Sequence, residues 1–143
     1  LELTESVFMR NVDDAREKFQ QLREFGVSVA LDDFGTGYSS LSYMKELPID
    51  IVKIDRSFVD GLPGDRDACA IVSAIAILAQ TLGIEVVAEG IETDDQLRYL
   101  RGLHVAVGQG YLMGKPMDAE ALEKLVMDQK PREDTIVATG TAS

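Results

Sequence analysis

The chain has 143 residues, of which 45% are hydrophobic and 27% charged, and its net charge is −11 at pH 7. This is an ordinary globular composition, and no apolar run approaches the roughly 18 residues that cross a bilayer. Such an acidic chain is a poor non-specific binder of nucleic acid, so we expect no DNA partner. The single cysteine, Cys69, excludes an internal disulfide. The negative charge of the chain would repel the negative charge of a phosphate ester. Such a compound could be a substrate only if bound metal ions offset this repulsion.

Short apolar runs at 1–5, 27–31, 51–54, 86–88 and 105–107 predict buried strands, because they are rich in β-branched residues and bounded by Gly, Asp or Pro. Acidic or amide side chains mark the ends of these runs. These side chains are Glu2 and Glu5 in the first run, and Asp32, Asp33, Asp55, Glu89 and Gln109 after the others.

Apolar periodicity and capping residues predict a helix after each strand. The helices are expected at 13–25, from Ser39 or Ser40 to Glu46, at 67–82, at 93–101 and at 118–127. Gly26 and Gly83 are typical helix stops, and Thr93 with Gln96 forms a capping box. Residues 128–143 have no apolar period, so we predict a disordered tail or linker there.

This alternation of strands and helices predicts an α/β fold built from parallel β/α units. Five such units cannot close an eight-stranded barrel, which typically takes about 250 residues. We therefore expect residues 1–127 to be the carboxyl-terminal part of a barrel domain, with the early strands before Leu1. Residues 1–143 alone should then be inactive.

The polar residues at the strand ends predict one converging site, because the carboxyl ends of parallel strands meet on one rim of a barrel. Several carboxylates there stay ionised only beside positive charge, and a pair of hard divalent cations would supply it. Asp32 and Asp33 are neighbours and would point opposite ways on a straight strand. Both can reach metal only if the backbone bends, which the following glycines permit.

The motifs around these residues form a specific series along the chain. They are Glu2-Leu3-Thr4-Glu5, Asp32-Asp33-Phe34-Gly35-Thr36-Gly37, Leu47-Pro48-Ile49-Asp50 with Val52-Lys53-Ile54-Asp55, Val87-Ala88-Glu89-Gly90-Ile91-Glu92, and Gly108-Gln109-Gly110-Tyr111 with Lys115-Pro116. In this order the series resembles the EAL domain family, bacterial phosphodiesterases specific for cyclic di-GMP. The resemblance implies a modified (β/α)8 TIM-type barrel and places the Glu-Ala-Leu signature and a metal-binding Asn before Leu1.

The same resemblance implies roles for several residues. Glu2 would bind one metal ion, Asp32 would bridge or bind the same ion, and Asp33 would bind a second. The ions would be Mg²⁺ or Mn²⁺. Glu89 would hold the attacking water at the metal and act as general base. Lys53 would contact that water or the phosphate, although a structural salt bridge to Asp55 or Asp33 is an alternative.

The remaining motif positions match residues that surround the site in the family. Glu5 resembles the residue that steadies the loop after Asp33, and this loop could join two copies in a homodimer. Asp55, Glu92 and Gln109 match positions that line the site. Glu92 could instead favour the positive end of the following helix, and Gln109 could be a turn amide.

The leading hypothesis is therefore metal-dependent hydrolysis of cyclic di-GMP to linear pGpG. The alternatives are a catalytically inactive EAL-type module that binds the nucleotide or protein partners, and an unrelated metal-using barrel such as an aldolase or enolase relative. We expect a cytoplasmic location and an amino-terminal sensory or cyclase domain in the full-length protein, which a preceding segment could tether to a membrane.

Overall fold

The computed structural model describes residues 1–4, 11–35 and 41–128. Its strands form one parallel sheet in the order β1-β2-β3-β4-β5, so neighbours in the sequence are neighbours in the sheet. The strands are β1 (Glu2–Thr4), β2 (Ala30–Phe34), β3 (Ile51–Ile54), β4 (Glu85–Ala88) and β5 (Val107–Gly108). This arrangement confirms the predicted parallel β/α fold.

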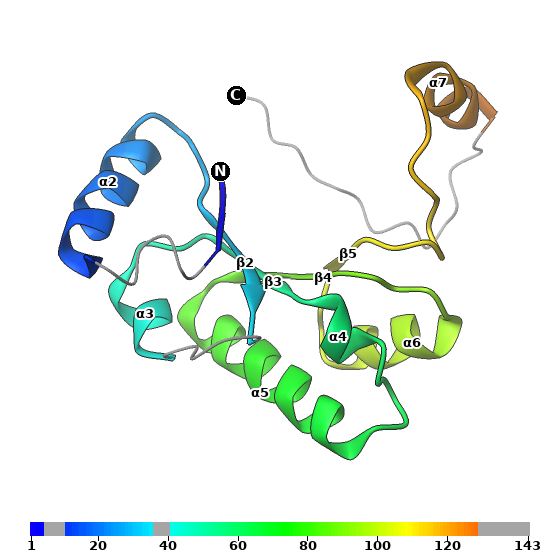
Figure 1. The fold of residues 1–143 in the computed structure, drawn as a ribbon, viewed down its shortest axis with the longest axis horizontal. Helices are drawn as coiled ribbons and strands as arrows, with labels where there is room; N and C mark the ends of the chain where they lie inside the picture. The colour runs from blue at the N-terminus through cyan, green and yellow to red at the C-terminus, as the bar shows by residue number, and fades with distance from the viewer. Residues whose placement is uncertain (5–10, 36–40, 129–143) are drawn as a thin grey trace.

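Helices connect the strands, as parallel pairing requires. They are α2 (Val12–Glu24), α3 (Leu41–Glu46), α4 (Arg56–Val59), α5 (Arg66–Leu82), α6 (Asp94–Gly102) and α7 (Ala119–Asp128). In Figure 1, α3, α5 and α6 lie together on one side of the sheet, whereas α7 stands apart. Every side chain of α7 from Ala119 to Met127 is exposed. Among the described helices, none is both long and apolar enough to span a membrane.

The long helix α5 shows how the sequence specifies these elements. Asp65 caps its first turn by accepting hydrogen bonds from the backbone N–H groups of Asp67 and Ala68. Gly83 ends the helix in the left-handed conformation, with φ of 71°. Between the caps the helix buries one apolar face, which consists of Ala68, Val72, Ile75, Ala76 and Ala79.

Strand alternation separates the packed face of the sheet from the face that carries polar side chains. Leu31, Val52, Ile54 and Ala88 are almost fully buried in the hydrophobic core. Because successive side chains point to opposite faces of a strand, Lys53 lies on the other face from Val52 and Ile54. The paired register of the strands places Glu2, Asp32 and Lys53 on this second face.

The structure corrects several sequence predictions. The second strand is Ala30–Phe34 and not 27–31, so both acidic residues lie within the strand. The last strand is Val107–Gly108 instead of 105–107. Helix α4 was not predicted, because four residues carry no apolar period. The predicted tail at 128–143 begins one residue too early, because Asp128 is the last residue of α7. Glu5, the loop at 36–40 and residues 129–143 lie outside the described residues.

Candidate active site

Lys53 is the centre of the polar face. Its ammonium Nζ lies 2.7 Å from Glu89 Oε1, 3.1 Å from Asp32 Oδ1 and 3.2 Å from Glu2 Oε1. The partners come from β1, from β2 and from the end of β4, which lie on both sides of β3 in the sheet. Lys53 is only 8% exposed, while the side chain of Glu2 is 62% exposed. The cluster is thus buried at the lysine and opens to solvent at Glu2.

The surroundings of Lys53 keep its side chain charged. Burial alone would lower the pKa of Lys53, but hydrogen bonds to Glu89, Asp32 and Glu2 and the charge of Glu89 raise it well above its ordinary value. The lysine is therefore a permanent positive charge at neutral pH. It offsets only part of the negative charge of its three partners.

The Asp32-Asp33 pair lies at an irregularity in β2. The pairing register with β3 shifts between Leu31 and Phe34, and Asp33 has a φ of 54°, in the left-handed region. The backbone N–H of Asp33 donates to Asp32 Oδ1 over 3.1 Å. The expected bend thus occurs at Asp33 itself, before the glycines. Asp32 faces Lys53, whereas Asp33 is exposed and its carboxylate is not among the described partners of Lys53.

Glu89 follows β4 directly, and Gln109 follows β5. The side-chain amide of Gln109 donates to Glu89 Oε1 over 2.8 Å, so this oxygen accepts from both Gln109 and Lys53. Among the described residues, none forms a hydrogen bond or ion pair with the other oxygen, Oε2. Glu89 can therefore be held firmly by one oxygen while the second is available to accept a proton.

Close backbone contacts hold Gln109 beside Glu89. The N–H of Gln109 donates to the carbonyl of Ala88 over 2.8 Å, and its own carbonyl accepts from Ile91 N–H over 3.1 Å. A Cβ atom on Gly110 would lie 2.1 Å from the Ile91 carbonyl oxygen, so only glycine permits this approach. In the Gly-Gln-Gly sequence, Gly110 is therefore required by the close approach of Ile91, and Gln109 supplies the hydrogen bond to Glu89.

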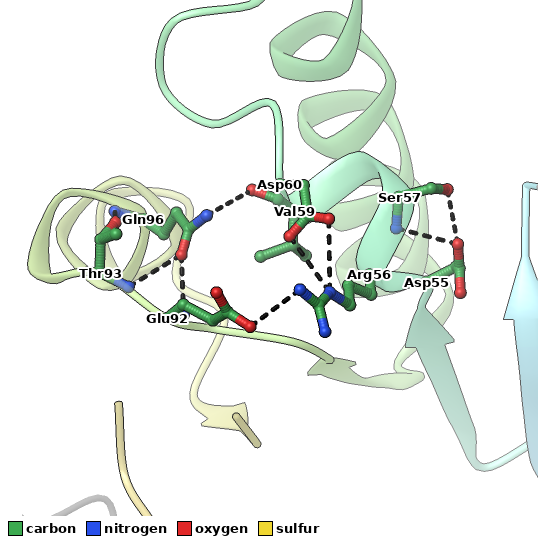
Figure 2. A network of polar contacts seen from close by, with 8 residues as sticks. All are labelled: Asp55, Arg56, Ser57, Val59, Asp60, Glu92, Thr93 and Gln96. Atoms are coloured by element: carbon green, nitrogen blue, oxygen red, sulfur yellow. Dashed lines mark hydrogen bonds and ion pairs between the residues drawn. The ribbon is translucent and has the colours of Figure 1, made fainter. Parts of the chain in front are cut away.

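Asp55 and Glu92 belong to a second polar network, drawn in Figure 2. Asp55 caps α4 by accepting from the backbone N–H and the hydroxyl of Ser57. The Ser57 hydroxyl hydrogen bond is the main reason that the pKa of Asp55 is lowered. Glu92 forms an ion pair with Arg56 over 2.8 Å. In the described chain, neither carboxylate forms an ion pair or hydrogen bond with Lys53.

The structure thus gathers Glu2, Asp32, Lys53, Glu89 and Gln109 and leaves Asp55 and Glu92 in the neighbouring network. Arg56 joins this network and had no role in the sequence analysis. In the sequence, the only feature that could have indicated a role for Arg56 is its position directly after Asp55, which follows a predicted strand.

The gathered carboxylates have the chemistry of a hard-cation site but are arranged around an amine. Each of the three directs an oxygen to within 3.2 Å of one positive charge, and carboxylate oxygen is the ligand that Mg²⁺ and Mn²⁺ prefer. Within residues 1–4, 11–35 and 41–128, no group of three His, Cys, Asp or Glu residues is placed to hold a metal ion by itself. The donor types fit, and further donors would be needed to complete a site.

The sequence profile of the EAL domain matches residues 1–116. The chain belongs to the EAL domain family. The cyclic di-GMP phosphodiesterase NbdA of Pseudomonas aeruginosa is 47% identical over 126 residues, which are 88% of this chain and 16% of NbdA. The chain thus spans about a sixth of the length of this curated relative.

Solved EAL structures agree with this membership. The MucR phosphodiesterase in complex with c-di-GMP superimposes with a TM-score of 0.79 at 50% identity, over 85% of this chain and 49% of that one. BlrP1 of Klebsiella pneumoniae, in a manganese and cyclic di-GMP complex, gives a TM-score of 0.72 at 35% identity, over 78% of this chain and 28% of that one. The fold of the chain is therefore part of the TIM-type barrel of EAL domains.

Proposed function

We propose that this chain forms the carboxyl-terminal part of the catalytic site of a phosphodiesterase that hydrolyses cyclic di-GMP to pGpG. The observation that carries the proposal is the convergence on Lys53 of β3 of three carboxylates, from Glu2 of β1, from Asp32 of β2 and from Glu89 directly after β4. EAL relatives are named cyclic di-GMP phosphodiesterases, which supports the choice of substrate. Degradation of an intracellular messenger would take place in the cytoplasm.

The residues of the cluster suit the requirements of phosphodiester hydrolysis. Glu89 is held through one carboxylate oxygen by Lys53 and Gln109, and its other oxygen can accept the proton of the attacking water as general base. Lys53 supplies a fixed positive charge for the non-bridging oxygens of the phosphate, where negative charge grows in the transition state. Gln109 holds Glu89 in place and would line the site.

Glu2, Asp32, Asp33 and Glu89 are the residues that would hold divalent cations. When bound, two such ions neutralise phosphate charge and activate a water molecule. Manganese in the BlrP1 complex supports the use of a divalent ion in this family. We propose Mg²⁺ or Mn²⁺ for this chain, with the remaining donors from the part of the EAL domain that precedes it in the sequence. Asp55 and Glu92 would line the site from their own network, and Glu5 would steady the loop after Asp33.

Replacement of Asp32 by Asn tests the proposal in a complete EAL domain that contains this chain. The introduced amide would keep an oxygen that can accept from the N–H of Asp33, so the local backbone should survive while one formal charge is lost. We expect hydrolysis to fall by about 10²-fold or more, with the melting temperature little changed. The surface variant Asp95→Asn, which disrupts an exposed ion pair with Arg98, should keep full activity.

Two results would contradict the proposal. One is a wild-type domain that binds cyclic di-GMP with Mg²⁺ or Mn²⁺ present but produces no pGpG, which would show an inactive binding module. The other is Asp32→Asn with unchanged turnover, which would place the metal and the chemistry elsewhere.

A further inference from the structure

The loop that carries Glu89 is held from α4 by a group of contacts around Arg56. The loop consists of residues 89–93, between β4 and α6. Arg56 Nη2 lies 2.8 Å from Glu92 Oε1, and Arg56 Nε lies 3.3 Å from Asp60 Oδ2. Asp60 thus orients the guanidinium toward Glu92 from the end of α4, as Figure 2 shows.

The aliphatic stem of Arg56 contacts the loop one residue after Glu89. A Cβ atom built on Gly90 would lie 2.4 Å from Arg56 Cγ, and Gly90 has a φ of 72°. Both facts restrict this position to glycine. Arg56 therefore contacts the loop at two points on either side of Ile91, with its stem at Gly90 and its head at Glu92.

Gln96 holds the far end of the same loop. Its side-chain oxygen accepts from the N–H groups of Glu92 and Thr93, and its side-chain nitrogen donates to the carbonyl of Val59 in α4 over 3.1 Å. Gln96 is 5% exposed, so this connection is buried. At the near end, the N–H of Glu89 donates to the Ile54 carbonyl at the end of β3. The loop is thus fixed at both ends, and Arg56 fixes its middle.

The strength of the individual contacts decides what Arg56 can do. The Arg56 side chain is 52% exposed and that of Glu92 is 38% exposed, and ion pairs with such exposure stabilise a fold only slightly. The packing of the stem against Gly90 is specific in its geometry. Arg56 is therefore suited to set the position of the loop more than the stability of the domain.

We infer that Arg56 is a positioning residue for Glu89, which acts by packing against Gly90 and pairing with Glu92. This inference rests on the proposed role of Glu89 as general base. A general base must lie within hydrogen-bond reach of the proton it takes, and small displacements of such groups reduce the rate strongly. Arg56 itself would not touch the substrate.

Two Arg56 variants test the inference in a complete EAL domain that contains this chain. Arg56→Ala removes both contacts, so kcat should fall by about tenfold while KM for cyclic di-GMP stays within about twofold of wild type. Arg56→Lys keeps a long stem and a positive charge and should recover most of the lost kcat. Arg98→Ala is the control, because Arg98 forms an exposed ion pair with Asp95 on α6.

Hydrogen exchange gives a readout that does not depend on catalysis. Loss of the Arg56 contacts should speed amide exchange in residues 89–92, with melting temperature close to wild type, and Arg98→Ala should leave exchange there unchanged. If the wild-type domain proved inactive, the proposed function would fail, but this exchange experiment would still test the effect of Arg56 on the loop.

A glycine pair supplies a second test. Gly90→Ala should lower kcat much more than Gly26→Ala, since Gly26 has a similar φ of 76° but no atom within 4 Å of the position that an added Cβ would take. The inference would be overturned by unchanged kcat in Arg56→Ala, by a rise in KM alone, by failure of Arg56→Lys to restore activity, or by equal effects of the two glycine variants.

Discussion

The two ends of the sheet use acidic side chains in different ways. At the amino end, Asp50 precedes β3 and accepts from the N–H of Val29 over 2.8 Å, while it pairs with Arg23 over 3.2 Å. Toward the carboxyl end, the single ammonium of Lys53 is shared by three carboxylates, and Glu2 reaches it from the start of β1. One end is balanced in charge, and the other carries an excess of negative charge among these residues.

Under the proposed function, this difference separates an end that serves stability from an end that serves catalysis. A carboxylate with one cation and one N–H donor joins two loops and needs no further partner. An excess of carboxylates around one buried amine is unfavourable for folding unless another positive group shares them. The proposed chemistry at the carboxyl ends of the parallel strands would account for such an arrangement.

Lys53→Met should give the largest effect, because it removes the only cation from the carboxyl-end cluster in the described chain. The methionine keeps a similar length but supplies no charge to the phosphate, so kcat/KM for cyclic di-GMP should fall by about 10²–10³-fold. Steady-state kinetics at saturating Mg²⁺ would measure this. Activity within about threefold of wild type would leave Lys53 as a purely structural partner of the carboxylates.

Asp50→Ala should have the opposite effect to Lys53→Met, because it should lower the stability of the domain and leave its catalytic activity unchanged. The change removes the acceptor of the Val29 N–H and the partner of Arg23, and we expect the free energy of unfolding to fall by about 1–2 kcal/mol. Turnover of the folded domain should stay at the wild-type level. Urea denaturation and a turnover assay on the same preparation separate the two effects. Loss of turnover without loss of stability would remove the distinction between the two ends.

Gln109→Leu should have a smaller effect at the carboxyl end. Gln109 is exposed and donates one neutral hydrogen bond to Glu89, and Lys53 still holds the same oxygen after the change. We expect kcat to fall about three- to tenfold, near the value of one net hydrogen bond. A loss as large as that of Lys53→Met would mean that Gln109 contacts the substrate directly.

The sequence predicted the carboxyl-end cluster better than the details that build it. Runs of apolar residues followed by acids indicated parallel strands, and parallel strands bring their carboxyl ends together. The predicted bounds of β2 were wrong because the sequence from Val27 to Val29 is typical of a strand, whereas the pair Asp32 and Asp33 is typical of a turn. The left-handed φ of Asp33 is a tertiary feature that no local pattern records.

The network around Arg56 could not be predicted for a different reason. Gln96 and Val59 are 37 residues apart in the sequence, and their contact depends on how α4 and α6 pack. The four-residue helix α4 is too short to show an apolar period. The capping box of Thr93 and Gln96 was predicted correctly, but the same Gln96 side chain also reaches α4, which local rules do not describe.

The smallest effect concerns pH and distinguishes Lys53 from an ordinary surface lysine. Burial lowers the pKa of Lys53 in the folded protein, but hydrogen bonds to its three carboxylates outweigh burial and raise this pKa above the ordinary value. A group whose folded pKa is raised contributes stability that is complete below its unfolded pKa, about 10.4 for lysine, and that disappears as pH rises through the folded value. The difference in unfolding free energy between wild type and Lys53→Met should therefore be constant from about pH 7 to 9 and shrink only above about pH 10.4. Urea titrations across this range would measure it, and a difference that already declines near pH 8 would mean that burial lowers the pKa of Lys53 despite its three carboxylates.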